Sequence, residues 1–297
     1  MLSILIPTYN TDITRLVEEL HQQGQALHFD FEIIVADDAS TELALLEENK
    51  KINAFSNARL VINEKNKGRT ATRKILMQEA RFPWLLFLDA DVLPKSDDFI
   101  RNFGFPDPPE AAIISGGIAY LETPPAREKM LRWKYGHCRE SKAAEIRKKE
   151  PHFILSGNLL THKEAFQKIN TFEGNQYGLD NLISLNILNT QTEVSHIDNP
   201  VYHLGLEENK NFIRKSIDSM KTTAFFVQNG TMPNDFRPVQ KVYIKMKKWG
   251  VLWFFRSVIW MFKRPILANL HSSQPNMRLF DLYRLYHYAR LMKSPHA

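Results

Sequence analysis

The sequence has very little cysteine and no recognisable targeting segment. Cys138 is the single cysteine among 297 residues, which excludes an intramolecular disulfide and every Cys-x-x-Cys metal or redox motif. The first residues, MLSILIPTYN, contain no basic start, no long apolar stretch and no small-residue cleavage site. They are typical of a first core strand rather than of a signal peptide, so we expect a cytoplasmic protein.

Four common catalytic motifs are also absent from the sequence. No G-x-G-x-x-G follows the first apolar run, and no G-x-x-x-x-G-K-[ST], H-E-x-x-H or G-x-S-x-G occurs anywhere. These absences remove the main support for a dinucleotide oxidoreductase, a P-loop NTPase, a zinc protease or a serine hydrolase. The composition, with 43% hydrophobic and 24% charged residues, is that of an ordinary globular protein.

Acidic residues are scarce in the last fifth of the chain. From Arg237 onwards there are twelve basic residues and one acidic residue, Asp281, for a net charge of +11. The whole chain carries +6, so the residues before Arg237 carry −5. This asymmetry predicts a basic segment that meets an anionic partner, either a membrane or a nucleic acid.

Short apolar runs alternate with stretches of helical period through the first 120 residues. This alternation is typical of βα units and a mostly parallel sheet. We expect strands at 2–7, 31–37, 60–62 and 84–88, and helices at 11–24, 41–55 and 69–80. Ligands of open sheets of this kind bind at the carboxyl ends of the strands.

The alternation of apolar runs and stretches of helical period becomes less regular after Pro94. We expect a strand at 111–121, a charged helix at 127–149, a strand at 153–160 and a helix at 179–188. The stretch NGTMPNDFRP at 229–238 is rich in turn-forming residues and is the best candidate for a linker. The predicted domains are a catalytic domain at 1–228, with a nucleotide-binding half at about 1–95 and an acceptor half at about 96–228, and a basic aromatic helical extension at 239–297.

Polar clusters follow three of the expected strands, at Pro7-Thr8-Tyr9-Asn10, Asp37-Asp38 and Asp89-Ala90-Asp91. Residues two apart in an extended segment project to the same side, so Asp89 and Asp91 can face one divalent cation. The alternative is a polar turn after a buried strand, where Asp forms local hydrogen bonds. An EF-hand is excluded, because Leu93 and Pro94 stand where that loop needs an oxygen ligand and a glycine.

Six segments, taken in their order and spacing, resemble the family-2 glycosyltransferases of the GT-A fold. They are SILIPTYN, EIIVADDAST, NKGRTATRKI, FLDADVLP, the block from ILSGNLL to LDNLISLNIL, and VSHIDNPVYHLG. The resemblance covers about residues 1 to 205. It implies an α/β GT-A nucleotide-diphospho-sugar transferase fold, with a mostly parallel central sheet flanked by helices and, beyond it, a helical C-terminal extension.

The resemblance also implies which residues bind the donor nucleotide. Tyr9, beside Pro7 and Thr8, would pack on the base, and Asp38, next to Asp37, would accept a hydrogen bond from the imide of the base. The remaining residues come from the third and fourth segments: Asn66, Gly68 and Arg73 near the ribose or phosphates, and Asp89 nearest the ribose and the metal shell.

The metal ligands and the catalytic base follow from the same resemblance. Asp91 would bind Mn²⁺ or Mg²⁺ directly, with Asp89 in the metal shell and His203 as a further ligand. For His203, a hydrogen-bonded histidine at a strand end is an equal alternative. Asp180 would be the general base that takes the proton of an acceptor hydroxyl, with inversion at the anomeric carbon. The sequence departs from the family at Leu179, where Glu usually precedes the base, and a helix N-terminal acid is the alternative for Asp180.

The expected function is transfer of a sugar, most simply from a UDP-sugar, to a hydroxyl of a glycan or lipid-linked acceptor, as in surface polysaccharide synthesis. One rival is a nucleotidyltransferase, which is disfavoured because the chain lacks a glycine-rich N-terminal loop. Another is a non-catalytic protein that binds sugar nucleotides or glycans, which Leu179 makes possible. The sequence does not indicate an oligomeric state.

The basic aromatic segment at 239–264 predicts contact with a membrane surface. On one continuous helix from Lys241 to Lys263, ended by Pro265, most cations would fall within an arc of roughly 80°. Trp and Phe would cover much of the rest, so we expect contact with an anionic membrane surface at the inner face of the cell membrane. The alternatives are a helix packed on the catalytic domain and a dimer contact. No nucleic-acid-binding module surrounds the segment, so we expect no nucleic-acid partner.

Overall fold

The computed structural model of the chain describes residues 1–172 and 177–292, which form two units. Unit 1 contains residues 1–121, 139–172 and 179–205, and unit 2 contains residues 122–138, 177–178 and 206–292. The linker predicted at 229–238 separates two helices that both lie in unit 2, so the chain divides earlier than that stretch.

Unit 1 is built on a sheet whose strand order is β3-β2-β1-β4-β8-β6-β9 in the described part of the chain. The first four strands are parallel: β1 (Leu2–Thr8), β2 (Phe31–Asp37), β3 (Ala58–Ile62) and β4 (Trp84–Leu88). Strands β1, β2 and β4 are buried along almost their whole length. Burial on both faces explains why they read as continuous apolar runs, as predicted.

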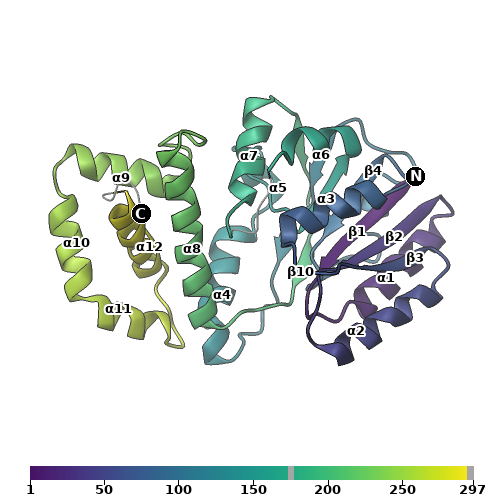
Figure 1. Ribbon diagram of the computed structural model, residues 1–297, viewed down its shortest axis with the longest axis horizontal. Coiled ribbons are helices and arrows are strands. Elements are labelled where there is room, and N and C mark those ends of the chain that lie inside the picture. Colours follow the sequence, from purple (N-terminus) through teal and green to yellow (C-terminus); the bar gives the residue numbers. More distant parts are fainter. Residues whose placement is uncertain (173–176, 293–297) are drawn as a thin grey trace. The chain divides into compact units, whose positions relative to one another are not determined.

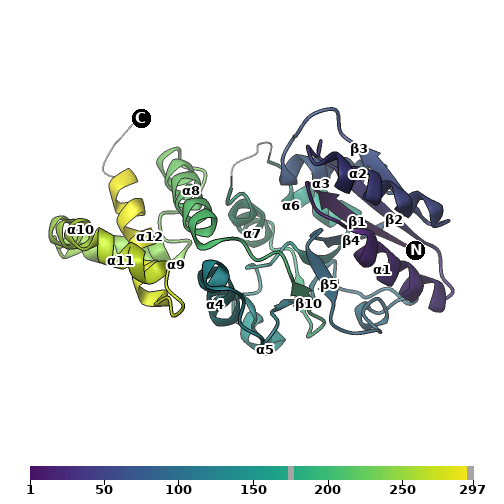
Figure 2. The same cartoon turned by 90° about the horizontal axis from the view of Figure 1, so that it is seen from below.

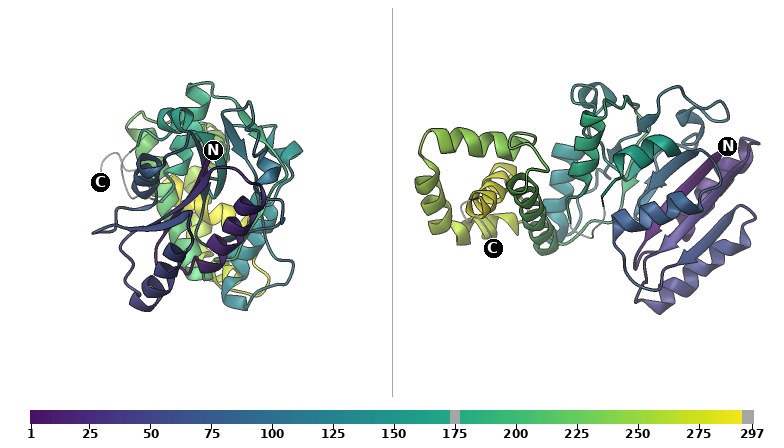
Figure 3. Two further views of the ribbon diagram at one scale, coloured as in Figure 1. Left: turned by 90° about the vertical axis from the view of Figure 1, so that its right-hand side faces the viewer. Right: turned by 45° about the horizontal axis from the view of Figure 1, so that its top comes forward.

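Helices cover both faces of this sheet. They are α1 (Thr14–Ala26), α2 (Leu43–Lys50), α3 (Arg69–Glu79), α6 (Lys163–Ile169) and α7 (Asp180–Asn189), with short 3₁₀ turns at Lys51–Ala54 and Arg101–Phe103. Leu76, Phe87, Phe166 and Ile183 share one core between the sheet and α3, α6 and α7. Figure 1 and Figure 3 show α1 and α3 on opposite faces, as right-handed βαβ crossovers in the order β3-β2-β1-β4 require.

The second half of the sheet is mixed. Strand β8 (Asn158–His162) is antiparallel to β4 and to β6 (Ile113–Ser115), and β6 is parallel to β9 (Val194–His196). A smaller sheet pairs β10 (Val201–His203) with β5 (Val92–Pro94) and β7 (Ile118–Ala119). The single strand expected at 111–121 is therefore two strands in different sheets. Gly117, with a φ of +90°, turns the chain between them.

The charged helix expected at 127–149 is wrong. The stretch consists of a 3₁₀ turn (Arg127–Lys129), α4 (Met130–Tyr135), a π turn (Gly136–Glu140) and α5 (Ala144–Arg147). Long-range bonds fix α5: Asp198 Oδ1 accepts from the Ala144 amide at 2.7 Å, and Arg147 donates to the carbonyl oxygens of Ser115 and Ile197 at 2.9 and 2.7 Å. These partners come from the strand ends, so the charge pattern does not reveal them.

Unit 2 is helical. Besides α4 it contains α8 (Asn209–Gln228), α9 (Pro238–Lys248), α10 (Leu252–Met261), α11 (Lys263–Leu270) and α12 (Met277–Leu291). Helix α12 packs against α8 on one side and α10 on the other, around a core that includes Phe212, Phe280 and Tyr286 (Figures 1 and 2). Asn276 caps α12 by accepting from the amides of Arg278 and Leu279.

The continuous helix expected from Lys241 to Lys263 is wrong. Gly250 has a φ of +69° and follows α9, while the amides of Gly250 and Val251 donate to the carbonyl oxygens of Lys247 and Met246. This is a Schellman C-terminus, for which glycine is the favoured residue. Pro265 does not end a helix either; it lies in the first turn of α11, where its missing N–H costs nothing. A helical wheel drawn across α9 and α10 is therefore invalid.

Candidate active site

The carboxyl ends of β1, β2 and β4 meet at one edge of the sheet, and the predicted polar clusters follow them. Thr8 pairs with Asp37 in the β1–β2 register, and the Thr8 carbonyl oxygen accepts from the Asp38 amide at 2.9 Å. Asp89 follows directly after β4. The parallel topology thus brings residues 8–10, 37–38 and 89–91 to one edge, as the strand pattern predicted.

The first loop at this edge is held by Asn10 rather than by Tyr9. Asn10 Oδ1 accepts from the amides of Thr41 and Glu42 at 2.8 and 3.1 Å, and Asn10 Nδ2 donates to Thr41 Oγ1. Asn10 has a φ of 47°, a conformation that Asn tolerates better than most residues. Tyr9 is left 45% exposed, so its ring is accessible for stacking.

Both aspartates after β2 serve the structure of their own loops. Asp37 is fully buried and accepts from the amide and hydroxyl of Ser40 at 2.8 and 2.6 Å. Asp38, 5% exposed, accepts from Asn63 Nδ2 and the amides of Lys67 and Gly68 at 2.7 to 2.9 Å. Three of its roughly four acceptor positions are therefore filled. The geometry favours a loop-positioning role over the expected hydrogen bond to the imide of the base.

Gly68 makes the turn that starts α3. Its φ is +84°, a region open mainly to glycine, and its amide is the donor that Asp38 Oδ2 accepts at 2.7 Å. Asn66 lies exposed in the same loop. Asp38 and Gly68 together fix where α3 begins and which way its first residues point.

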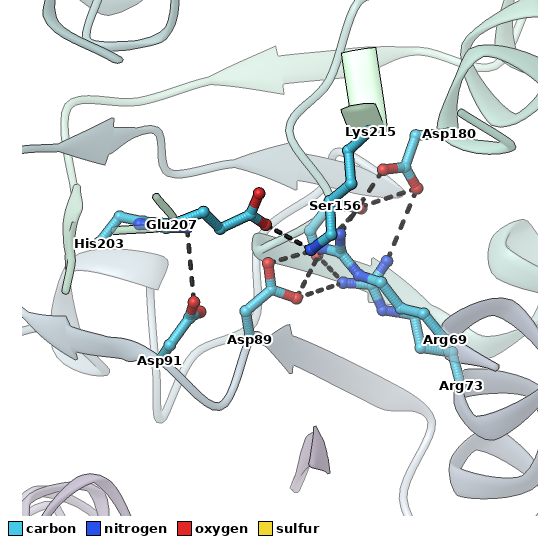
Figure 4. A network of polar contacts seen from close by, with 9 residues as sticks. All are labelled: Arg69, Arg73, Asp89, Asp91, Ser156, Asp180, His203, Glu207 and Lys215. Atoms are coloured by element: carbon cyan, nitrogen blue, oxygen red, sulfur yellow. Dashed lines mark hydrogen bonds and ion pairs between the residues drawn. The ribbon is translucent and has the colours of Figure 1, made fainter. Parts of the chain in front are cut away.

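Two arginines, one turn apart on α3, reach Asp89. Arg69 Nη2 lies 2.6 Å from both carboxylate oxygens of Asp89, and Arg73 Nη2 lies 2.9 Å from Asp89 Oδ1 (Figure 4). Arg73 also donates to the Ser156 carbonyl oxygen at 2.7 Å. The side chain of Arg73 is 3% exposed and that of Arg69 is 44% exposed. Asp89 is thus held by cations, and Arg73 is committed to the protein rather than free for phosphates as expected.

Burial and neighbouring charges determine the pKa values of Arg73 and Asp89. Burial lowers the pKa of Arg73 to about 10, with repulsion from Arg69 acting in the same direction. Burial alone would raise the pKa of Asp89, but Arg69 and Arg73 outweigh it and hold the pKa below its usual range. Near neutral pH, Asp89 is therefore ionised and the Arg73 guanidinium group is charged.

Asp180 is the first residue of α7 and lies in the same network. Its Oδ1 accepts from Ser156 Oγ at 3.1 Å, and Arg69 Nη1 and Arg73 Nη1 lie 3.8 and 3.9 Å from its carboxylate. The side chain of Asp180 is 46% exposed. A carboxylate that is held by a hydroxyl yet open to solvent has the geometry of a base that can reach an acceptor.

Asp91 faces His203 across the small sheet. Asp91 Oδ2 lies 3.6 Å from His203 Nε2, while β5 and β10 pair Val92 with His203 (Figure 4). Partial burial raises the pKa of Asp91. Attraction to His203 acts to lower this pKa, and repulsion from Asp89 acts to raise it further. A side chain at Gly205 would collide with the Asp91 carboxylate, so glycine leaves room there.

The Asp91–His203 pair fits a divalent cation. Two ligand atoms, each about 2.1 Å from one ion, lie at most about 4.2 Å apart, and the observed 3.6 Å is within that limit. His203 Nδ1 is buried without a hydrogen-bond partner. Among the described residues, however, no group of three or more His, Cys, Asp or Glu side chains is arranged to hold a metal. Asp89, bound by Arg69 and Arg73, does not complete the set.

A comparison with protein families decides the identity of this fold. The family model described as Glycosyl transferase family 2 matches residues 3–169, more than half of the chain. The chain belongs to glycosyl transferase family 2. The chain has the GT-A fold that the order of its six segments predicted.

Curated relatives of this glycosyltransferase match only part of it. An uncharacterized glycosyltransferase of Haemophilus influenzae (strain ATCC 51907 / DSM 11121 / KW20 / Rd) is 34% identical over 137 residues, covering 42% of this chain and 44% of that protein. The teichoic acid poly(glycerol phosphate) polymerase of Staphylococcus epidermidis (strain ATCC 35984 / DSM 28319 / BCRC 17069 / CCUG 31568 / BM 3577 / RP62A) is 31% identical over 93 residues, covering 30% of this chain and 12% of that protein. The chain spans less than half the length of these relatives.

Solved structures agree on the fold. The mannosyltransferase PcManGT from Pyrobaculum calidifontis, in complex with GDP-Man and Mn²⁺, superposes with a TM-score of 0.53 and 16% identity, covering 81% of this chain and 68% of that one. At this identity the likeness shows the fold alone. The Mn²⁺ in that complex belongs to that protein.

Sequence reasoning missed three residues of this site: Asn63, Arg69 and Ser156. A signal for Arg69 was present, because Arg69 and Arg73 are four apart on an expected helix and share one face. Ser156 and Asn63 carry no such signal, since their partners lie 24 to 87 residues away in the sequence.

Proposed function

We propose that the protein is a metal-dependent, inverting glycosyltransferase that moves a sugar from a nucleoside-diphosphate donor to a hydroxyl of a glycan or lipid-linked acceptor. The simplest donor is a UDP-sugar, and the transferred group a hexose or N-acetylhexosamine. The observation that carries the proposal is one contiguous edge of unit 1. It holds an aspartate–histidine pair, a pair of arginines on a carboxylate, and an exposed aspartate.

The nucleotide would bind over the ends of β1 and β2. Tyr9 is the exposed aromatic ring there and would stack on the base. Asp37, Asp38 and Gly68 would shape the loops around it, because their polar groups are used within the protein. Pro7, Thr8 and Asn66 would lie beside the nucleotide.

The arginines would divide two tasks between them. Arg73 is buried and fixed on Asp89 and Ser156, so we assign it to holding Asp89 toward the ribose. Arg69 is the more exposed of the two, and its side chain would meet the diphosphate. A guanidinium group matches phosphate oxygens by paired hydrogen bonds and would favour the negative charge that grows on the leaving group.

Asp91 and His203 would hold the divalent cation, Mn²⁺ or Mg²⁺, with Asp89 at the edge of its shell. When bound, such a cation offsets the charge on the departing diphosphate. Carboxylate ligands suit Mg²⁺ and Mn²⁺. The 3.6 Å separation of Asp91 Oδ2 and His203 Nε2 and the room that Gly205 leaves beside Asp91 support the assignment.

Asp180 would act as the base. An acceptor hydroxyl on the solvent side of its carboxylate would lose its proton to Asp180 as the oxygen attacks the anomeric carbon. Ser156 would orient the carboxylate through the 3.1 Å hydrogen bond. Attack from the side opposite the diphosphate inverts the configuration at that carbon.

We place the reaction at the inner face of the cell membrane, in the synthesis of a surface polysaccharide, because a lipid-linked acceptor is anchored there. Within residues 1–172 and 177–292, the helices are all too short or too polar to cross a bilayer. Any contact with the membrane through this part of the chain would therefore be made at its surface.

A screen of nucleotide sugars for thermal stabilisation tests the proposal. A donor at about 100 times its dissociation constant adds about 2.7 kcal/mol to the free energy of unfolding. We expect at least one UDP-sugar to raise Tm, more with Mn²⁺ than without, and Asp91→Asn to remove the Mn²⁺-dependent part. Asp98→Asn, on an exposed aspartate paired with Arg101, is the matched control. Equal shifts in both variants would contradict the metal assignment, and no shift with any nucleotide sugar would contradict the function.

A further inference from the structure

Large apolar side chains gather on the outside of unit 2 around α10. Trp253 and Trp260 are 72% and 70% exposed, and Trp249, just before α10, is 71% exposed. Val251, Phe254, Met261 and Phe262 are exposed as well. We call these seven residues (Trp249, Val251, Trp253, Phe254, Trp260, Met261 and Phe262) the aromatic surface. So many exposed tryptophan and phenylalanine rings on one helix and its flanks mark an interaction site.

The aromatic surface is separate from the side chains that pack α10 on unit 2. Leu252, Phe255 and Ile259 are the residues of α10 that contact the cores formed with α9, α11 and α12. Trp253, Phe254 and Trp260 contribute to neither core. Helix α10 is therefore already anchored, and its exposed rings are not needed to hold the fold.

Cations stand at both ends of this helix. Lys245, Lys247 and Lys248 are exposed at the end of α9, and Lys263 and Arg264 are exposed at the start of α11. The segment 239–264 contains seven basic residues and no acidic residue. Figure 1 shows α9, α10 and α11 in succession around α12, so that both sets of cations flank α10.

This charge distribution decides between two occupants of the aromatic surface. A second copy of the chain would bring seven cations against seven like charges, and repulsion between them disfavours such a pair. An anionic lipid surface instead attracts the cations and accepts the rings, because tryptophan prefers the level of the lipid headgroups. Trp also has an indole N–H that needs a polar partner, which the headgroup region supplies.

We propose that the aromatic surface, flanked by the lysines of α9 and the cations at the start of α11, binds an anionic phospholipid bilayer. The bend at Gly250 presents α10 as a corner, with its rings in the headgroup region and cations on either side. Membrane contact thus does not need the continuous amphipathic helix expected from the sequence. The inference rests on the membrane location in the proposed function, and lipid binding is measured without donor so that its failure leaves sugar transfer untouched.

The test is co-sedimentation of the full chain with vesicles of phosphatidylcholine and phosphatidylglycerol, against vesicles of phosphatidylcholine alone. We expect binding to the anionic vesicles at about 0.1 M salt and weaker binding at about 1 M, where the Debye length falls from about 10 Å to about 3 Å. Replacing Lys245, Lys247 and Lys248 together by Gln should weaken binding about 100-fold, since each cation near the surface contributes about five-fold.

Two matched controls separate this surface from general stickiness. Lys142, Lys148 and Lys149 are exposed lysines of unit 1, and their triple Gln variant should bind like the parent. Trp253→Ala should weaken binding about 10-fold at either salt concentration, because it removes apolar burial rather than charge. Phe225→Ala removes a ring on α8 that is 58% exposed and should have no effect.

Three results would overturn the proposal. The first is a parent protein that stays free of anionic vesicles at low salt. The second is equal weakening by the two lysine triple variants, which would remove the assignment to this surface. The third is a dimer, seen by light scattering, that Trp253→Ala converts to a monomer, which would make the aromatic surface a contact between copies.

Discussion

Arg73 Nη2 donates to Asp89 Oδ1 at 2.9 Å, although Arg73 is on α3 and Asp89 follows β4. The same guanidinium group donates to the Ser156 carbonyl oxygen at 2.7 Å. This side chain ties the edge of the parallel strands to the segment that leads into β8. A buried arginine with two such partners fixes the position of the first aspartate of the FLDADV segment.

The two arginines of α3 should behave differently when replaced. Arg73→Met leaves the Asp89 carboxylate and the Ser156 carbonyl oxygen short of a partner in a buried place, so we expect a loss of about 3 kcal/mol in the free energy of unfolding. Arg69→Met, at a side chain that is 44% exposed, should cost less than about 1 kcal/mol but weaken donor binding. Urea unfolding and calorimetric titration of a nucleotide sugar measure both. Similar losses of stability in the two variants would contradict the division of roles.

Asp180→Asn removes a proton acceptor and keeps the shape of the side chain. We expect donor affinity to stay within about two-fold of the parent, while kcat falls by about 10² to 10⁴. Ser156→Ala, which removes only the orienting hydroxyl, should lower kcat less. Steady-state kinetics and donor titration separate the two quantities. A parallel loss of donor binding and kcat in Asp180→Asn would mark Asp180 as a structural acid at the start of α7.

Replacing His203 distinguishes a metal ligand from a histidine that serves only the structure of the strand end. If it is a ligand, His203→Phe should raise the Mn²⁺ concentration needed for half-maximal donor binding at least about 10-fold. Donor binding without metal should change little. His162→Phe, on a histidine at the end of β8, is the matched control. Titration of Mn²⁺ at constant donor gives the comparison. An unchanged Mn²⁺ requirement in His203→Phe would assign the histidine to the protein's own structure.

His287 gives unit 2 a dependence on pH. Burial lowers the pKa of His287 to about 4, with Lys263, Arg290 and Lys221 acting in the same direction. An unfolded histidine has a pKa of about 6.5, so the unfolded state binds an extra proton between the two values. The free energy of unfolding should therefore fall as the pH drops from about 6.5 towards 4. It should be insensitive to His287 above about 6.5.

Urea unfolding near pH 7 and near pH 5 tests this dependence. His287→Phe should lose less stability than the parent between the two conditions. His28→Phe, on an exposed histidine outside unit 2, should lose as much as the parent. The assignment fails if His287→Phe and the parent lose stability equally.

The parallel half of the sheet was predictable and the rest was not, for a physical reason. Strands β1, β2 and β4 are buried on both faces, so their apolar runs are visible in the sequence. Beyond Pro94 the strands are short, and contacts made elsewhere in the chain determine the turns between them. The break between β6 and β7 at Gly117 and the fixing of α5 by Asp198 are examples.

The candidate site shows the same limit. The pattern of strand ends placed Asp38, Asp89 and Asp91 correctly at one edge, because topology alone brings them there. It did not show that Asp38 is used by the amides of Lys67 and Gly68, or that Asp89 is held by Arg69. Which acceptor a carboxylate offers to a ligand depends on these partners. The Schellman turn does have a sequence signal, because Gly250 is the residue that such a helix end favours.

Release of nucleoside diphosphate from a panel of nucleotide sugars, with Mn²⁺ and then with a chelator, tests the central claim most directly. A glycosyltransferase without its acceptor transfers the sugar slowly to water. The account predicts that the parent protein releases free sugar and nucleoside diphosphate from at least one donor in the presence of Mn²⁺, and that chelation stops the release. Donors that all remain intact with the parent protein and Mn²⁺, while one of them binds, would contradict catalysis and leave a protein that only binds sugar nucleotides.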